Sequence, residues 1–291
     1  MFAGGKDTYD MKRRYFVFDA EKCIGCYNCL HACKDEHVGN DFSPVTLPQK
    51  LHRQYWITTT EHVRGMAPMI DVAYLTEPCG HCENAPCLAA GKGAAVRRSD
   101  GVVLIDPEKA GEAGDLSDAC PFGKISYNEE HGLSQKCTFC VHLLDAGWQQ
   151  PRCAHACPLG ALRMEYEEPG IMAERLVSGE FEQIGEQYSS FGSCLYVRNL
   201  YRVNTLFLGG KVTVITGETE TCFEGCTVTL EHSGTVIQSQ TTDAFGEYKF
   251  DRLLPGEYTV CISAVGYAAH RMQVFPDKSI YTGTVTLSRE Q

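Results

Sequence analysis

The stretch 23-CIGCYNCLHAC-33 places four cysteines at the spacing Cys-x2-Cys-x2-Cys-x3-Cys. This spacing is typical of a [4Fe–4S] motif, in which the first three cysteines on a tight loop bind one cluster. The fourth cysteine lies on the following helical turn and ligates a neighbouring cluster. The motif therefore predicts an iron–sulfur fold, and it requires a partner motif elsewhere in the chain.

The partner motif is 137-CTFCVHLLDAGWQQPRCAHACP-158, whose last cysteine precedes Pro158 as in the bacterial pattern. If the fourth cysteine of each motif crosses to the other cluster, the two motifs supply two complete sets of four thiolates. The first set is Cys23, Cys26, Cys29 and Cys157, and the second is Cys33, Cys137, Cys140 and Cys153.

A third site is indicated by 79-CGHCENAPCLAAG-91, which holds Gly91 where a fourth cysteine would stand. Cys120 precedes Pro121, as the last cysteine of such a motif does, but the rest of its motif is missing. The positions of the three missing thiolates hold Ala110, Ala113 and Leu116.

The four absent thiolates would all have bound one cluster under the crossing rule, and the four present ones bind its neighbour. We therefore predict a third [4Fe–4S] cluster, and we expect the residues that replace the lost ligands to pack as apolar filler. The ligands of this third cluster are Cys79, Cys82, Cys87 and Cys120.

The composition agrees with metal binding. The chain of 291 residues has sixteen cysteines, no apolar run long enough for a membrane span and no signal peptide before its first motif. Many cysteines without a secretory signal favour metal ligation over disulfides, and the formal charge of −11 argues against a nucleic-acid partner. The remaining cysteines are expected to be free or packed thiols. They are Cys194, Cys222, Cys226 and Cys261.

The second part of the chain follows a different pattern. From about residue 205, short alternating segments rich in Val, Thr and Tyr are separated by Gly and Pro turns. This pattern predicts a seven-stranded β-sandwich over residues 205–291, after a cluster-binding domain over residues 1–204. The run 241-TTDAFGEYKFDRLLPGEYTVCISAVGY-267 resembles transthyretin-like and carboxypeptidase-regulatory-like domains. The fold class is thus α+β, a ferredoxin-like multi-cluster domain followed by a transthyretin-like or Ig-like sandwich.

Regular elements in the first part are expected to be short. The segments 15-YFVFD-19 and 101-GVVLID-106 read as strands, and 139-FCVHLLDAG-147 reads as a short helix. A further helix is predicted to start near Pro169 and to end near Gly179.

The four motifs together resemble the iron–sulfur electron-transfer subunits of molybdopterin enzymes in the dimethyl sulfoxide reductase family. Within that family, 77-EPCGHCENAPC-87, 119-ACPFG-123, 136-KCTFCVHLLD-145 and 151-PRCAHAC-157 look like the small subunits of pyrogallol–phloroglucinol transhydroxylases. Residues 1–14 look like an extension relative to that pattern.

This resemblance implies a non-catalytic electron-transfer subunit with three [4Fe–4S] clusters. Its partner would be a large subunit that carries molybdenum with two pterin guanine dinucleotides and transhydroxylates or reductively dehydroxylates polyhydroxylated aromatics. A three-cluster chain suits an enzyme that exchanges electrons with a soluble donor, or one that needs no net redox input. We expect a cytoplasmic location; the alternative is export in the folded state with a partner that carries a twin-arginine signal.

Two alternatives remain at this point. The chain could serve another molybdopterin oxidoreductase, such as a formate, sulfur-compound or nitrate enzyme. It could also be a zinc-stabilised interaction protein, since Cys-x2-Cys pairs hold zinc as well.

Several polar residues lie beside the cysteines. Surface or packing roles are assigned to His81 and His155, and 35-DEH-37 is interpreted as a partner-contact or capping segment. Lys136 and Arg152 either offset the negative charge of the clusters or are ordinary solvated charges.

Overall fold

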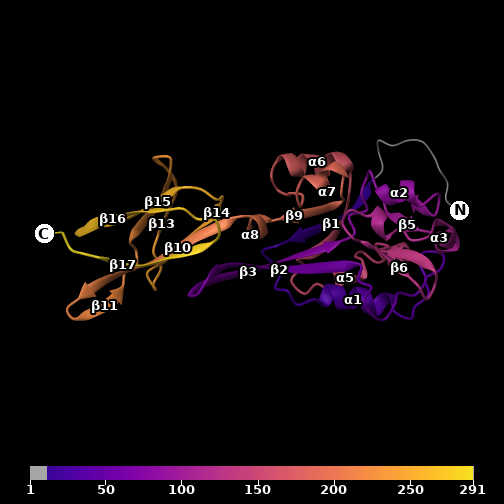
Figure 1. The fold of residues 1–291 in the computed structure, drawn as a ribbon, viewed down its shortest axis with the longest axis horizontal. Coiled ribbons are helices and arrows are strands. Elements are labelled where there is room, and N and C mark those ends of the chain that lie inside the picture. Colours follow the sequence, from indigo (N-terminus) through magenta and orange to yellow (C-terminus); the bar gives the residue numbers. More distant parts are fainter. Residues whose placement is uncertain (1–11, 291) are drawn as a thin grey trace. The chain divides into compact units, whose positions relative to one another are not determined.

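The computed structural model describes residues 12–290, and Figure 1 labels most of its helices and strands. The chain divides into two compact units, one of residues 1–61 and 74–200 and the other of residues 62–73 and 201–291. Most of the N-terminal extension lies outside the described residues. Among the helices that are described, none is both long enough and apolar enough to cross a membrane.

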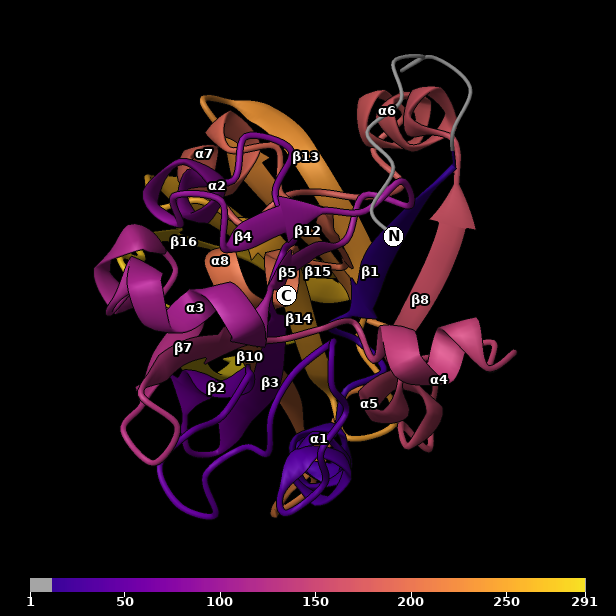
Figure 2. The same cartoon turned by 90° about the vertical axis from the view of Figure 1, so that its right-hand side faces the viewer.

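The first unit is organised around β1 (Arg13–Asp19), which is the central strand of a three-stranded sheet. Figure 2 shows β8 (Leu162–Glu167) beside it; this pair is antiparallel, whereas β9 (Leu195–Arg198) pairs with β1 in parallel. Alternate residues of β1 serve opposite faces. Tyr15 and its neighbours on one face pack with Met172, and Phe16 on the other face stacks on Phe139 with ring centroids 4.0 Å apart. The strand predicted at residues 15–19 is confirmed.

The other strands of this unit form hairpins. The pairs are β2 (Ile57–Met66) with β3 (Met69–Pro78), β4 (Ala95–Arg97) with β5 (Val103–Ile105), and β6 (Ile125–Asn128) with β7 (Leu133–Lys136). The strand predicted in 101–106 is β5, and all three of its residues are buried.

Most helices are short, because the cysteine motifs interrupt the chain with turns. They are α1 (Asn28–His37), α2 (Pro86–Ala90), α3 (Pro107–Ala113), a 3-10 turn (Ser117–Ala119), α4 (Val141–Asp145), α5 (Arg152–His155), α6 (Pro169–Val177) and α7 (Glu186–Ser190). The predicted helix near Pro169 is α6, which ends just before the left-handed Gly179. The helix predicted within 139–147 is α4.

The second unit is a two-sheet sandwich preceded by α8 (Tyr201–Asn204). One sheet contains β10 (Leu206–Thr216), β11 (Thr219–Cys222), β14 (Glu247–Leu253) and β17 (Ile280–Leu287), and the other contains β12 (Thr227–His232), β13 (Thr235–Thr241), β15 (Tyr258–Ala264) and β16 (Tyr267–Val274). Inward-facing residues such as Val228, Phe250 and Ile262 form its core.

The described part of this sandwich has eight strands, one more than expected. The alternating pattern did not mark β11 or β16. All four residues of β11 are exposed, and no residue of β16 is fully buried. β11 has no apolar face for alternation to reveal, and the β16 residues that pack against the core, such as Met272 and Val274, are only partly buried.

The tip of the β2–β3 hairpin, residues 62–73, belongs to this second unit. Arg64 in the tip is almost fully buried and pairs with Asp71 and with Asp251, the latter at 2.9 Å. Arg202 and Lys249 complete the charge network around Asp71. No pattern in the sequence indicated this association.

Candidate iron–sulfur sites

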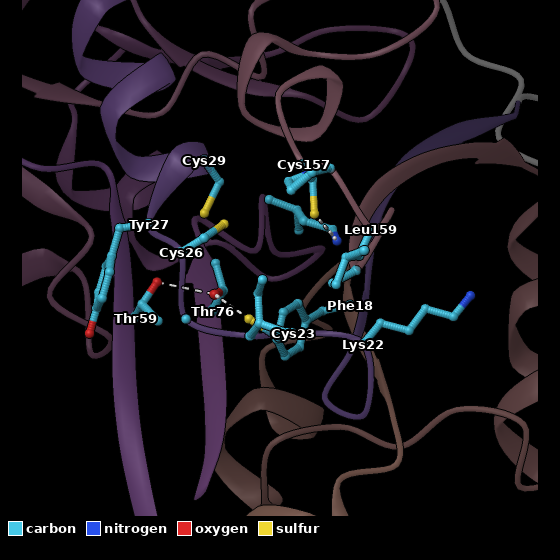
Figure 3. Close-up of a pocket in the computed structure, with 15 residues that line it drawn as sticks. Phe18, Lys22, Cys23, Cys26, Tyr27, Cys29, Thr59, Thr76, Cys157 and Leu159 are labelled. Carbon is cyan, nitrogen blue, oxygen red and sulfur yellow. Dashed lines mark hydrogen bonds between the residues drawn. The ribbon is translucent and has the colours of Figure 1, made fainter.

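The first predicted ligand set lines one pocket (Figure 3). Cys23, Cys26 and Cys29 come from the loop after β1 and the start of α1, and Cys157 comes from the turn after α5. The loop turns sharply at Gly25, whose backbone is left-handed with a φ of 65°. A side chain there would also lie 2.4 Å from the Tyr74 ring, so glycine is needed both for conformation and for space.

This first site lies near the surface of its unit. Cys26 is exposed, and the other three cysteines are half-buried. Ile24 and Leu159, which line the same pocket, are 62% and 50% exposed. The Leu162 N–H donates to Cys157 Sγ at 3.4 Å, which favours the thiolate over the thiol.

The second set is the most deeply buried. Helices α1 and α5, which carry Cys33 and Cys153, pack against each other, and Cys137 and Cys140 immediately precede α4. All four cysteines are buried. Burial raises the pKa of Cys33 well above its usual range, and the neighbouring Cys137 and Cys140 raise it further. Burial, and after it the neighbouring Cys140 and Cys33, raise the pKa of Cys153 as well, so the four side chains lie close enough to interact.

A backbone donor and a histidine nitrogen lie beside sulfurs of the second set. The Phe139 N–H donates to Cys137 Sγ at 3.4 Å, and His37 Nε2 lies 3.7 Å from Cys140 Sγ. Burial, with a contribution from nearby His142, lowers the pKa of His37 to about 3. The ring is thus neutral and can donate a hydrogen bond to a ligating sulfur.

The third set lines a second pocket. Cys79 and Cys82 follow β3, Cys87 is in α2, and Cys120 follows the 3-10 turn. The Lys124 N–H donates to Cys120 Sγ at 3.4 Å. Two buried lysines, Lys124 and Lys136, also line this pocket, together with His81.

Packed residues occupy the positions where the four ligands of a further cluster are absent. Ala110 is fully buried and Leu116 is 4% exposed in one apolar cluster, and Ala113 packs against it. A Cβ at Gly91 would lie 2.7 Å from the Ala95 Cβ and 2.8 Å from the Cys87 carbonyl oxygen, so position 91 has no room for a cysteine. The prediction that these positions pack as apolar filler is confirmed.

The thiols in these sites are costly to ionise without a cation. Burial raises the pKa of Cys29 to about 11 and those of Cys82 and Cys140 to about 12. Coordination to a metal ion deprotonates a thiol outright, so bound iron would offset the free-energy cost of ionising these buried thiols. The four-thiolate sets fit [4Fe–4S] clusters in number and in their crossed origin. Within residues 12–290, no three His, Cys, Asp or Glu side chains are placed to hold a single metal ion.

The interpretation of 35-DEH-37 as partner-contact or capping residues is wrong for Glu36 and His37, and it stays a prediction for the exposed Asp35. Glu36 pairs with Arg152 at 3.5 Å and with His142 at 3.1 Å, and the His37 side chain is buried. Glu36 and His37 connect α1 to the partner motif of residues 137–158 within the unit, because α1 packs on α5. Arg152 is correspondingly engaged by carboxylates rather than simply solvated.

The two histidines beside ligands differ. His155 is exposed, as predicted for a surface residue, whereas His81 is 2% exposed and lines the third pocket. Lys136 is buried, so it is not an ordinary solvated charge. One signal in the sequence could have identified His81. It stands at the position in its Cys-x2-Cys loop where the first motif has Gly25.

The four remaining cysteines are free thiols, as expected. Cys194 and Cys226 are buried, Cys261 is half-buried and Cys222 is exposed.

Comparisons with known proteins identify both parts of the molecule. Residues 70–167 match the 4Fe-4S dicluster domain, and residues 209–288 match the carboxypeptidase regulatory-like domain. The pyrogallol hydroxytransferase small subunit of Pelobacter acidigallici is 40% identical over 95% of this chain and 100% of its own length.

More distant relatives match about half of the sequence. The thiosulfate reductase electron transfer subunit PhsB of Salmonella typhi is 33% identical over 50% of this chain and 72% of its own. A subunit of the anaerobic dimethyl sulfoxide reductase of Escherichia coli is 31% identical over 50% of this chain and 70% of its own length.

Proposed function

Because this chain belongs to the family of iron–sulfur electron-transfer subunits that includes the pyrogallol hydroxytransferase small subunit, we propose that it transfers electrons for a molybdopterin enzyme that acts on polyhydroxylated aromatics. The reaction is transhydroxylation or reductive dehydroxylation, and it takes place in a large partner subunit. That subunit holds molybdenum with two pterin guanine dinucleotides. This chain is the non-catalytic member of the complex.

The observation that carries this proposal is the convergence of cysteines that are distant in the sequence. Cys157 lines the same pocket as Cys23, and Cys120 lines the same pocket as Cys79. This is the crossed arrangement that ferredoxin spacing requires. Full-length similarity to one small subunit supports an aromatic substrate over the other substrates of the wider family.

In this proposal, three [4Fe–4S] clusters are bound by the three sets of four cysteines given above. When bound, the clusters supply one-electron redox chemistry. The chain sets the environment of each: the first is open to solvent, the second is enclosed, and the third lies beside Lys124 and Lys136. Positive charge and N–H donors near a cluster favour its reduced form.

The proposed domains are residues 1–204 for the clusters and residues 205–291 for the sandwich, with the hairpin tip 62–73 packed in the second unit. We place the complex in the cytoplasm, where a soluble electron donor could reach it. Export in the folded state with a signal-bearing partner is the alternative.

A second candidate is service to another molybdopterin oxidoreductase. The thiosulfate and dimethyl sulfoxide reductase subunits favour it, since they share the cluster-binding half of the sequence. Their matches cover only half of this chain, whereas the small-subunit match extends over nearly all of it.

The test is elemental analysis of the native complex, with the co-purifying subunit identified by mass. About twelve irons per copy of this subunit, from three clusters of four, with one molybdenum is the expected result. Activity on pyrogallol and catechols would then separate the two candidates. Iron without molybdenum would refute the molybdopterin partner, and colourless protein containing zinc would refute electron transfer.

A further inference from the structure

The third residue of the first Cys-x2-Cys segment in each of the three cysteine-rich stretches has a left-handed backbone. The residues are Gly25 with a φ of 65°, His81 with 42° and Phe139 with 58°. Glycine adopts this conformation freely, but a residue with a Cβ is strained there because the Cβ approaches the following carbonyl oxygen. The side chains at positions 81 and 139 must therefore make contacts that offset this strain.

The contacts of Phe139 are apolar, and they are sufficient to offset the strain of its left-handed backbone. Its ring is fully buried and stacks on Phe16 at 4.0 Å between centroids. His81 is almost as enclosed, and its ring lies 5.1 Å from the Phe139 ring. Packing alone would be served better by an apolar ring, so the two nitrogens of His81 need a separate explanation.

One nitrogen of His81 has a clear role. Its Nδ1 accepts a hydrogen bond from the Val103 N–H at 3.1 Å, and Lys136 Nζ, also a donor, lies 3.5 Å from the same atom. A nitrogen that accepts from Val103 carries no proton, so the ring proton is on Nε2.

The other nitrogen has no partner that protein atoms supply. Nε2 of His81 is buried and makes no hydrogen bond within residues 12–290. A buried donor that stays unpaired loses its hydration without compensation. The natural acceptor is therefore a group that occupies the pocket beside it.

His81 lines the pocket of Cys79, Cys82, Cys87 and Cys120. The other buried donors there are already engaged, because Lys136 Nζ donates to the Val103 and Cys137 carbonyl oxygens at 2.5 and 3.1 Å. Lys124 Nζ donates one of its three N–H groups to Thr58 Oγ1 at 2.6 Å. Among His81, Lys124 and Lys136, only His81 has a donor nitrogen that makes no hydrogen bond at all within residues 12–290.

We propose that His81 donates a hydrogen bond from Nε2 to a sulfur of the cluster held by this third set and so favours its reduced form. The inference rests on the proposed function, since it needs a cluster in the pocket. His81 acts on that cluster through one hydrogen bond and does not ligate it. The first motif has glycine at the equivalent position, so its cluster lacks this donor.

The direct test is pulsed EPR on the native complex labelled with 15N-histidine. The reduced third cluster should show coupling to one histidine nitrogen and to an exchangeable proton. This measurement needs no variant, so it decides the proposal even if substitutions impair folding. A correctly assembled third cluster without such coupling overturns the inference.

The second test is His81→Phe, which copies the residue found at position 139 and removes the donor. At a fixed potential, the ratio of reduced to oxidised third cluster should fall about tenfold, which is about 59 mV for a one-electron couple. His81→Gln, which keeps an N–H donor, should recover part of the shift. His155→Phe is the matched control, because His155 also lies between ligands but is exposed.

The outcomes separate the two proposals. Full iron content with an unchanged third potential in His81→Phe overturns the role of His81 but leaves electron transfer intact. If the reduction potential of the second cluster shifts instead of that of the third, the acceptor belongs to the second cluster. This result would overturn the proposal. Native protein without iron–sulfur clusters refutes the proposed function itself.

Discussion

The pocket of the third cysteine set and the apolar packing around Ala110 lie in one apolar cluster and follow from the same pair of motifs, yet their polar side chains differ. The pocket is lined by thiols, two buried lysines and a histidine. The neighbouring region contains Ala110, Ala113 and Leu116, and Gly91 allows the end of α2 to approach Ala95 closely. A cluster site therefore depends on its whole set of ligands, and small apolar residues can close the space when the set is absent.

The largest effect that would test this contrast is loss of the third cluster alone. Cys120→Ser should reduce the iron content by about one third, from about twelve to about eight atoms per copy of the subunit, because one cluster of four depends on this thiolate. The first and second EPR signals should remain. Iron content of the purified complex is the measurement.

The matched control is Cys194→Ser, which changes a buried cysteine outside the three sets. It should retain all of the iron. Loss of every cluster in Cys120→Ser, or of none, would contradict the assignment of Cys120 to the pocket.

In the apolar packing around Ala110, Leu116→Ala should lower the free energy of unfolding by about 2–5 kcal/mol, because it opens a cavity among packed side chains. Iron content should not change. Thermal unfolding of the complex measures the first quantity and elemental analysis the second.

Leu51→Ala is the control, since Leu51 is 62% exposed and its loss should change stability by about 0.5 kcal/mol or less. If Leu116→Ala removed iron, the region would not be mere filler.

A smaller loss is expected from Gly91→Ala. The new Cβ would overlap with Ala95 and with the Cys87 carbonyl, so stability should fall by about 1–3 kcal/mol. Gly111→Ala in α3 has open space around its Cβ and should raise stability by about 0.4–1 kcal/mol. Equal thermal midpoints for the two variants would show that position 91 is not tightly packed.

The smallest effect concerns charge beside the pocket. Lys124→Met should lower the reduction potential of the third cluster by an amount equivalent to about 1–2 kcal/mol, since an interaction of about 4 kcal/mol at 4 Å weakens with distance. Lys109→Met, on the exposed side of α3, should leave all three potentials unchanged. A redox titration followed by EPR distinguishes them, and equal shifts would mean that burial of Lys124 is irrelevant.

The sequence predicted those features that depend on counting and on periodicity. Cys120 could be joined to Cys79 because a four-iron cluster needs four thiolates, and the structure brings both to one pocket. The strands of the sandwich core, such as β12 and β14, alternate visibly between apolar and polar residues.

Features that depend on tertiary contacts were not accessible in this way. The spacing of 79-CGHC-82 identifies the ligands, but it does not reveal that the ring of His81 is buried against Val103. Likewise, Glu36 lies far from Arg152 in the sequence, and only the packing of α1 on α5 brings them together. The strand β11 was missed because a fully exposed strand has no apolar face to alternate.

The hairpin tip of residues 62–73 has a consequence for the order in which the protein is made. Arg64 precedes its partner Asp251 by 187 residues. At about 5–20 residues per second, the ribosome completes Asp251 roughly 10–40 s after Arg64. The tip must therefore wait, with its buried arginine still lacking this carboxylate, until the sandwich strands emerge. Closure of the second unit around the tip is consequently a late event in biosynthesis, after every cysteine of the three predicted ligand sets has been synthesised.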